Sequence, residues 1–342
     1  MAYTTINKSS VHFNTMLYTG DDGTRNITET GTFQADLVWL KKRNSASSHH
    51  LVDSVRGATK SLSSDASSAE ATESSGVTGF VSDGFSLGGQ SGYNNTGDTF
   101  ASWTWKAGTS QTLNSGNVTS TVRANTTAGF SIVSWTGTAG NILVSHGLGA
   151  VPKMIIVKNR SITQEWAVYH ASLGATKFLE LNQTAAESSN SNRWNNSNPD
   201  ATDFIVSSDG SVNGSGNSMI AYCFAEKQGY SKFGSYTGNG NTDGTFVYTG
   251  FKPAFIMVKG SNESNQDWAI FDNKRDPINK VTQRIQPSSS AAESGGQDID
   301  FLSNGIKFRV TGDFINGSYN YIYMAFAEAP LVGSNGVTAK AR

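Results

Sequence analysis

Three short apolar stretches that resemble one another lie at wide intervals along the chain. They occupy residues 33–41 (FQADLVWLK), 151–158 (VPKMIIVK) and 251–259 (FKPAFIMVK). Runs rich in Ile, Val, Met and aromatic residues favour β-strands. Successive side chains of a strand point to opposite faces, so Trp39 faces away from Val38 and Leu40, yet all three are apolar. A strand that is apolar on both faces must be covered on both, and the pattern therefore predicts three core strands.

The surroundings of this strand recur with it, which indicates an internal triplication. In every copy an aromatic-Thr-Gly triplet (from Tyr18, Trp135 and Tyr236) begins 23 residues before the closing lysine (Lys41, Lys158 and Lys259). Each copy continues with a Glu-Ser signature (Glu73, Glu187, Glu293), a turn pair (Asp83-Gly84, Asp209-Gly210, Asn304-Gly305) and a closing aromatic strand (Trp105, Phe224, Phe326). Chance supplies any one of these matches, but not the whole series in one order three times. We expect the lysines at equivalent strand ends and the large aromatic residues Trp39, Trp105, Phe224 and Phe326 in the core.

Composition and turn signals predict an all-β fold. The chain has 342 residues with 36 Gly, 15% charged and 11% aromatic residues, and no long stretch has the period of an amphipathic helix. Strand-like runs separated by Asp-Gly and Asn-Gly turns are typical of antiparallel sheets. Roughly 100 residues of this pattern bury a core most simply as two packed layers. We therefore predict three tandem, related β-sandwich repeats, of a jelly-roll or lectin-like kind, each with its own core.

The repeats define the domain boundaries. We expect an N-terminal arm at 1–12, β-sandwich repeats at 13–107, 129–228 and 229–330, a Ser/Thr-rich connector at 108–128 with strand character from Val118 to Val122, and a C-terminal tail at 331–342. The arm is polar and precedes the first repeat, so we expect it to contact a neighbouring molecule and to be dispensable for folding. The Ser- and Ala-rich residues 61–77 are expected to form an exposed loop or a short helix.

Charge and cysteine content argue against several classes of protein. A formal net charge of −1 disfavours nucleic-acid binding, which needs basic groups to neutralise phosphates. No apolar run approaches the length of a membrane span and no signal peptide is visible, so we expect neither nucleic acid nor a membrane as a partner. Cys223 is the only cysteine, which excludes an intramolecular disulfide. Its place between Tyr222 and Phe224 predicts a buried, inert thiol.

The titratable residues predict no catalytic, cofactor-binding or metal site. His49, His50 and Asp53 carry metal-ligating groups, but adjacent histidines on a strand point to opposite faces and the set is absent from the other copies. The three repeated glutamates invite comparison with the acids of a glycosidase. Each occupies an equivalent place in a separate repeat, which favours a repeated structural role, such as capping a turn or closing a loop.

One loop of the second repeat has the composition of a carbohydrate contact. Trp194 stands among Asn195, Asn196 and Asn198, and an exposed aromatic ring beside amide donors suits a sugar. The competing interpretation is a tryptophan that anchors a long loop. The sequence leaves both open.

Longer motifs run through all three repeats. They are residues 18–20 (YTG), 36–43 (DLVWLKKR) and 53–57 (DSVRG), then 130–137 (FSIVSWTG), 146–149 (HGLG), 152–160 (PKMIIVKNR) and 166–174 (WAVYHASLG), then 233–250, Pro253 and 272–277. With the start MAYTTI, this series resembles a family of "MAYTTI"-type proteins of marine bacteriophages, over essentially the whole chain. Ala35 departs from the family, which usually has proline there. The resemblance implies a virion structural protein and supplies no catalytic residues.

Together these observations favour a non-enzymatic structural protein of a phage particle, assembled in the cytoplasm of the bacterial host. We expect a tail-fibre, tail-tip or head-decoration component with an adhesive role. It would form a symmetric homo-oligomer and contact other phage structural proteins and a host-surface glycan or receptor. The alternative is a polysaccharide-degrading tail enzyme, which needs paired carboxylates roughly 5–10 Å apart in a cleft.

Overall fold

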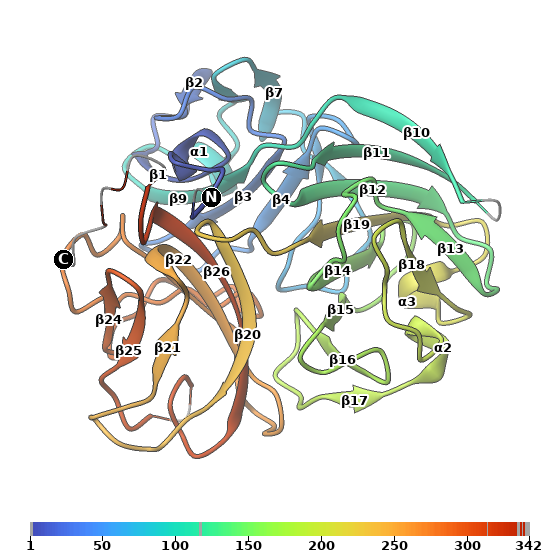
Figure 1. Ribbon diagram of the computed structural model, residues 1–342. Helices are drawn as coiled ribbons and strands as arrows, with labels where there is room; N and C mark the ends of the chain where they lie inside the picture. The colour runs from blue at the N-terminus through green and yellow to red at the C-terminus, as the bar shows by residue number, and fades with distance from the viewer. Residues whose placement is uncertain (1–2, 116–117, 313, 334–335, 337, 339–342) are drawn as a thin grey trace.

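The structure is a computed structural model that describes residues 3–115, 118–312, 314–333, 336 and 338. Almost all of its regular elements are antiparallel strands, and the helical segments in these ranges are single turns. The three repeats form three units around a central axis, visible as blue, green and orange-to-red sectors in Figure 1. The predicted all-β class is confirmed.

Each unit is built on a four-stranded inner sheet with one strand order. The first unit orders β1 (Phe13–Thr19), β9 (Thr99–Trp105), β3 (Leu37–Lys42) and β4 (His50–Asp53). The second orders β12 (Phe130–Thr136), β19 (Ser218–Phe224), β14 (Met154–Asn159) and β15 (Ala167–His170). The third orders β20 (Ser231–Thr237), β26 (Asn320–Pro330), β22 (Phe251–Gly260) and β23 (Ala269–Asp272). The apolar stretches of the sequence are β3, β14 and β22, next to the closing strand of each unit.

The strand register is also the same in the three units. Trp105 lies opposite Leu37, Phe224 opposite Met154, and Phe326 opposite Phe255. Further along the same pairs of strands, Lys41 faces Ala101, Lys158 faces Ile220 and Lys259 faces Ile322. The lysines therefore occupy equivalent strand ends, as the 23-residue spacing predicts.

A smaller sheet covers the outer face of each inner sheet. These sheets are β2 (Arg25–Thr28), β8 (Gly84–Leu87) and β7 (Val77–Val81) in the first unit, β13 (Ile142–Ser145) and β18 (Asp203–Val206) in the second, and β21 (Phe246–Tyr248), β25 (Gly305–Phe308) and β24 (Ile299–Leu302) in the third. Between the layers each unit has its own core, which contains Val38, Ile155 or Ile256. Asp83-Gly84 and Asn304-Gly305 lie at the turns of the hairpins β7–β8 and β24–β25, but Asp209 instead caps α3 (Gly210–Asn213).

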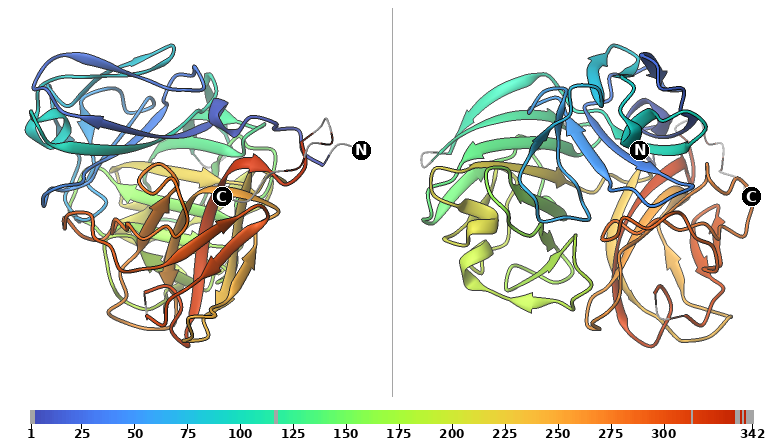
Figure 2. Two further views of the ribbon diagram at one scale, coloured as in Figure 1. Left: turned by 90° about the vertical axis from the view of Figure 1, so that its left-hand side faces the viewer. Right: turned by 180° about the vertical axis from the view of Figure 1, so that it is seen from behind.

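The inner faces of the three sheets meet in a fourth core that belongs to the whole chain. It contains Trp39, Ile156 and Met257. Each directly follows the outer-core residue named above, so its side chain points to the opposite face of the strand. At its centre the Phe326 ring lies 4.9 Å from Phe13 and 6.1 Å from Phe224, centroid to centroid, so aromatic residues of all three units pack together. The predicted aromatic residues Trp39, Trp105, Phe224 and Phe326 are all buried. The views in Figure 2 show the three units as one packed body rather than separate domains on linkers.

The expected connector is largely part of a sheet. Strands β10 (Ser110–Asn114) and β11 (Thr119–Asn125) form a hairpin that pairs with β12. On the other side of the same inner sheet, β16 (Lys177–Glu180) and β17 (Ser188–Ser189) extend it to eight strands. The strand character predicted near Val118 is thus found in β11, where Val122 is buried against the second unit's core.

The N-terminal arm packs on its own chain, which the sequence-based expectation missed. Tyr3 Oη donates to the carbonyl oxygen of Gly250 at 2.6 Å, and Thr4 Oγ1 donates to that of Gln228 at 2.7 Å. Ile6 is buried in the shared core, and the 3₁₀ turn η1 (Ser9–Val11) packs against β26. Residues 3–12 therefore complete the fold. Met1, Ala2 and most of the expected tail at 331–342 lie outside the described residues.

Three buried asparagines hold the loop that follows each repeated Thr-Gly pair. Asn94 and Asn213 end the single turns α1 (Ser91–Asn94) and α3, and Asn316 occupies the corresponding place in the third unit. The side chain of each bonds the loop that follows Thr-Gly, as when Asn213 Nδ2 donates to Gly140 O at 2.6 Å. A Cβ at Gly137 would lie 2.2 Å from the carbonyl oxygen of Gly214, so only glycine allows this approach.

Candidate functional site

The three units are joined in a ring by segments that reach from one unit to the next. We call these clasp segments: residues 60–72, with β5 (Lys60–Ser61) and β6 (Ala71–Thr72), residues 180–189, and residues 284–294. Their carbonyl groups accept hydrogen bonds from the following unit: Trp166 Nε1 to Ser63 O at 2.8 Å, Trp268 Nε1 to Glu180 O at 2.9 Å, and His49 Nε2 to Gln286 O at 3.0 Å. The third clasp segment returns to the first unit and closes the ring. The first clasp segment falls mostly within 61–77, where the sequence suggested an exposed loop or a short helix. It is instead a largely extended segment that packs against the second unit.

The repeated lysines belong to these junctions. Lys158 Nζ donates to Ser67 O at 3.1 Å, Lys41 Nζ to Ser290 O at 3.3 Å, and Lys259 Nζ to Thr184 O at 3.4 Å. Each bond crosses from one unit to the clasp segment of another. Burial lowers the pKa of all three lysines to about 8, because it disfavours the charged form. Their recurrence reflects the need to join units.

At the junction of the first and second units, a carboxylate lies between two arginines. Arg160 donates two hydrogen bonds to Glu70, at 2.8 and 3.0 Å, and Arg56 Nη1 donates a third at 3.1 Å. Burial alone would raise the pKa of Glu70, but the hydrogen bonds and charges of the two arginines outweigh it and hold the pKa below its usual value. Behind them Arg56 pairs with fully buried Asp53, which also accepts from Tyr222 Oη at 2.9 Å.

The junction of the third and first units repeats this network. Arg43 donates to Glu293 at 2.8 and 3.0 Å, and Arg275 Nη1 donates to it at 3.1 Å. Arg275 pairs with fully buried Asp272, which accepts from Trp103 Nε1 at 3.1 Å. Bidentate arginine–carboxylate pairs are among the stronger hydrogen-bonded contacts in proteins, so both junctions are firmly joined.

The junction of the second and third units keeps the carboxylate and loses both arginines. The backbone N–H of Glu187 donates to Ser261 O at 2.7 Å, as that of Glu70 donates to Arg160 O and that of Glu293 to Arg43 O. Ser261 therefore stands where the other junctions have Arg43 or Arg160. By the same strand register Leu173 replaces Arg56 or Arg275, and His170 replaces the buried aspartate. His170 Nε2 lies 3.2 Å from Tyr323 O, while burial lowers its pKa to about 4, so the ring is neutral.

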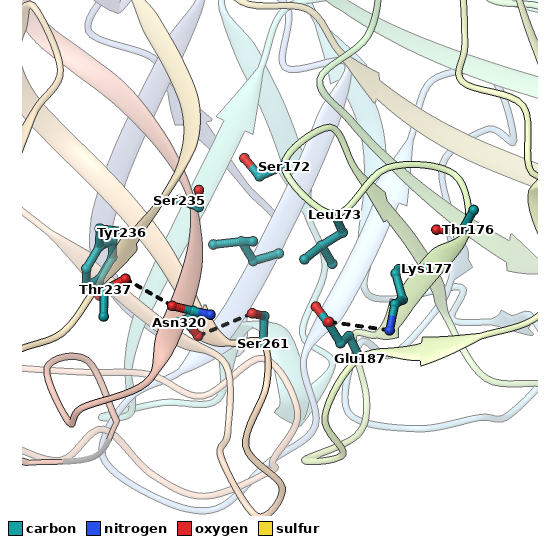
Figure 3. A pocket seen from close by; sticks show the side chains of 11 residues that line it. Ser172, Leu173, Thr176, Lys177, Glu187, Ser235, Tyr236, Thr237, Ser261 and Asn320 are labelled. Atoms are coloured by element: carbon teal, nitrogen blue, oxygen red, sulfur yellow. Dashed lines mark hydrogen bonds and ion pairs between the residues drawn. The ribbon is translucent and has the colours of Figure 1, made fainter.

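A pocket of about 500 Å³ occupies this junction. Its polar lining comes from Ser172, Thr176, Lys177, Ser235, Thr237 and Asn320, together with Glu187 and Ser261. Leu173, Ile322 and Tyr236 supply apolar surface. Figure 3 shows Glu187 and Lys177 on one side of the pocket and the bonded group of Thr237, Asn320 and Ser261 on the other. The broken symmetry of the ring marks this pocket as the candidate site.

The structure corrects one member of the glutamate series. Glu70, Glu187 and Glu293 make the equivalent backbone contacts, whereas Glu73 accepts a hydrogen bond from Gln90 inside the first unit at 2.8 Å. Residues 68–75 contain two glutamates, Glu70 and Glu73. Only Glu73 is followed by serine, so the Glu-Ser pattern selected the wrong residue. The sequence did carry a signal for the arginines: the strand-closing lysine is followed two residues later by Arg43 and Arg160, but by Ser261 in the third repeat.

In the loop predicted to contact a glycan, the tryptophan is buried and only the asparagines are exposed. Trp194 is only 2% exposed, and its ring lies 6.0 Å from that of Tyr169 in the core of the second unit, so it anchors the loop from α2 (Ser191–Trp194) and cannot stack on a sugar. Asn195 and Asn196 are exposed in left-handed backbone conformations. Asn198 is exposed too, but its Oδ1 accepts hydrogen bonds from Tyr169 Oη and the Ala175 N–H. Glycan contact through these asparagines stays a prediction.

The remaining titratable candidates have structural partners. His49 Nδ1 accepts from Trp39 Nε1 at 2.9 Å, so its other nitrogen carries the proton donated to Gln286 O. His50 stacks on Tyr93, with ring centroids 4.0 Å apart. Cys223 is fully buried, and burial raises the pKa of its thiol, as expected of an inert cysteine.

Fold and junctions together define an all-β protein made of three two-layer units closed around one shared core. The chain belongs to the family described as a domain of unknown function (DUF7483), whose model matches residues 8–330. No curated protein matches the sequence. Within the described ranges, no helix has the length and apolar character needed to span a membrane.

Proposed function

We propose that this chain is a non-enzymatic structural component of a bacteriophage particle, in a tail fibre, a tail tip or a head decoration. In this role it is assembled in the host cytoplasm and joins other particle proteins as a symmetric oligomer. Exposed loops on its outer surface contact a host-surface glycan or receptor. The resemblance of its repeated motifs to "MAYTTI"-type phage proteins is the source of the proposal.

One structural observation supports it most directly: the repeated ionisable residues are used to hold the units together. Arg43, Arg160 and the buried lysines bond across junctions, and Glu70 and Glu293 are each engaged by two arginines. Carboxylates held in this way are poorly placed to exchange protons with a substrate. A rigid ring that presents variable loops suits adhesion and display.

The loops available for adhesion differ among the units. In the second unit Asn195 and Asn196 are exposed, and in the third unit residues 239–243 are exposed after the repeated Thr-Gly. The N-terminal arm cannot serve as a free tether through residues 3–12, because these dock on the chain itself. We therefore assign contact with neighbouring particle proteins to the outer surface of the ring.

The test begins with purified particles of the phage whose genome encodes this chain. Mass spectrometry and immunogold labelling should find the protein in stoichiometric amounts and at one position in the particle. Purified protein should bind host cells, and Asn195→Ala with Asn196→Ala should reduce that binding. Particles without the protein would overturn the proposal, and depolymerisation of host polysaccharide by the purified protein would support the enzyme alternative instead.

A further inference from the structure

The pocket at the junction of the second and third units lies where the other two junctions each hold two guanidinium groups. In the other two junctions the carboxylate accepts a bidentate arginine at 2.8 and 3.0 Å and a second arginine at 3.1 Å. Glu187 is anchored through the same backbone contact, at 2.7 Å, so its carboxylate is presented from the equivalent position. Among the described residues, no arginine pairs with it.

We propose that this pocket binds a ligand carrying a guanidinium group, with Glu187 as the acceptor. This inference goes beyond the proposed role in a phage particle and does not depend on it. A planar guanidinium matches the two oxygens of a carboxylate with parallel hydrogen bonds, which is the geometry that Glu70 and Glu293 have inside the protein. A ligand would supply from outside what Arg43 and Arg160 supply elsewhere.

The contents of the pocket fit such a ligand. Ser261 and Leu173 are smaller than the arginines that they replace, and a pocket of about 500 Å³ remains. Leu173 and Ile322 offer apolar surface for an alkyl stem, while Ser235 and Asn320 offer hydroxyl and amide groups for its polar end.

The lysine already in the pocket does not take the place of an arginine. Lys177 Nζ lies 3.6 Å from Glu187 Oε1, too far for a hydrogen bond, and 38% of its side chain is exposed. A flexible, exposed lysine can turn into solvent when a better-matched cation enters. Glu187 is itself 24% exposed, against 13% for Glu70 and 11% for Glu293, so a ligand can reach it.

The test is isothermal titration calorimetry of the full chain with L-arginine and with L-citrulline. The two have nearly the same shape, but the ureido group of citrulline is neutral, so L-arginine should bind and L-citrulline should not. Glu187→Gln should weaken L-arginine binding by about tenfold or more, the usual effect of losing a charged hydrogen-bond partner. Glu226→Gln, which changes another partly exposed carboxylate paired with a lysine, is the matched control and should bind as the parent does.

A second variant fills the pocket from within. Ser261→Arg places a guanidinium where the other junctions have one, so it should abolish L-arginine binding and raise the melting temperature. Acetyl-Gly-Arg-Gly-amide distinguishes the source of the guanidinium: tighter binding than free L-arginine would indicate an arginine side chain of a partner protein, and weaker binding would indicate a free small molecule. Equal binding of L-arginine and L-citrulline, or unchanged L-arginine binding by either Glu187→Gln or Ser261→Arg, would overturn the proposal.

Discussion

Arg160 and Glu70 lie 90 residues apart in the sequence and are joined by two parallel hydrogen bonds, at 2.8 and 3.0 Å, across the boundary between the first and second units. Glu70 also accepts from Arg56, whose side chain is fully buried beside Asp53. The first-second junction is therefore a network of hydrogen-bonded ion pairs whose side chains come from both units. The third-first junction repeats it with Arg43 and Glu293.

Arg160→Ser gives the first-second junction the serine that the third repeat has at position 261. We expect it to lower the free energy of unfolding by about 2 kcal/mol, because a charged hydrogen-bonded pair is lost from a site with little solvent access. Urea denaturation of Arg160→Ser, Glu70→Gln and the double variant gives the coupling energy. Arg25→Ser removes an exposed pair within one unit and should cost much less, because solvent screens such a pair. Similar losses for Arg25 and Arg160 would contradict the importance of the junction.

The shared core predicts that the chain unfolds as a single body. Phe224 packs against Phe130 of its own unit and Trp105 and Phe326 of the others, so Phe224→Ala should cost roughly 3–5 kcal/mol. Calorimetry should show one transition that moves to lower temperature as a whole. Ile278→Ala, at a site 74% exposed, is the control and should leave the transition in place. Three separable transitions, of which Phe224→Ala moves only one, would show that the units fold independently.

The N-terminal arm should be required for full stability. Ile6 is 3% exposed and lies in the shared core, so Ile6→Ala should cost about 2–5 kcal/mol. Thr5→Ala changes the exposed neighbour and should have almost no effect on the melting temperature. Deletion of residues 1–12 should destabilise the chain further by removing the bonds of Tyr3 and Thr4. An unchanged melting temperature after that deletion would restore the view of a dispensable arm.

A buried acid predicts a loss of stability as the pH rises from about 4.5 to 7. Burial raises the pKa of Glu29 from 4.5 to about 7 and outweighs the neutral hydrogen bonds from Thr104 and Asn14, of which that from Thr104 Oγ1 measures 2.8 Å. The native state thus holds a proton that the unfolded chain releases above pH 4.5 or so. The stability that Glu29 contributes is complete below that pH and is lost as the pH rises through about 7.

Glu29→Gln stays neutral at every pH and isolates this effect. Its stability relative to the parent should increase between about pH 4.5 and 7 by roughly 3 kcal/mol, since one pKa unit corresponds to about 1.4 kcal/mol, and should then level off. Urea denaturation across this range measures it. A flat difference for Glu29→Gln across this range would mean that the buried carboxyl keeps an ordinary pKa.

The sequence by itself determined the all-β class, the three core strands and the equivalent strand ends of their lysines. Alternating apolar residues such as Val38 and Trp39 specify two covered faces, because a strand side chain has only two directions in which to point. The repeated spacing from the aromatic-Thr-Gly triplet to the lysine specified equivalent pairing, since register follows residue count along paired strands. Burial of Cys223 and the large aromatic residues followed from the same pattern.

Only the tertiary structure decided what covers the inner faces and where the candidate site lies. The alternation that places Trp39, Ile156 and Met257 on one face is the same whether that face packs within its own unit or against the other two. The pairs that close the ring join residues far apart in sequence, as Arg43 and Glu293 are 250 positions apart, and no local pattern specifies such partners. The site depends on substitutions at Ser261 and Leu173, in different repeats, that look unrelated along the chain. They leave a pocket beside Glu187 because folding brings both places to one junction, where neither residue fills the space of an arginine.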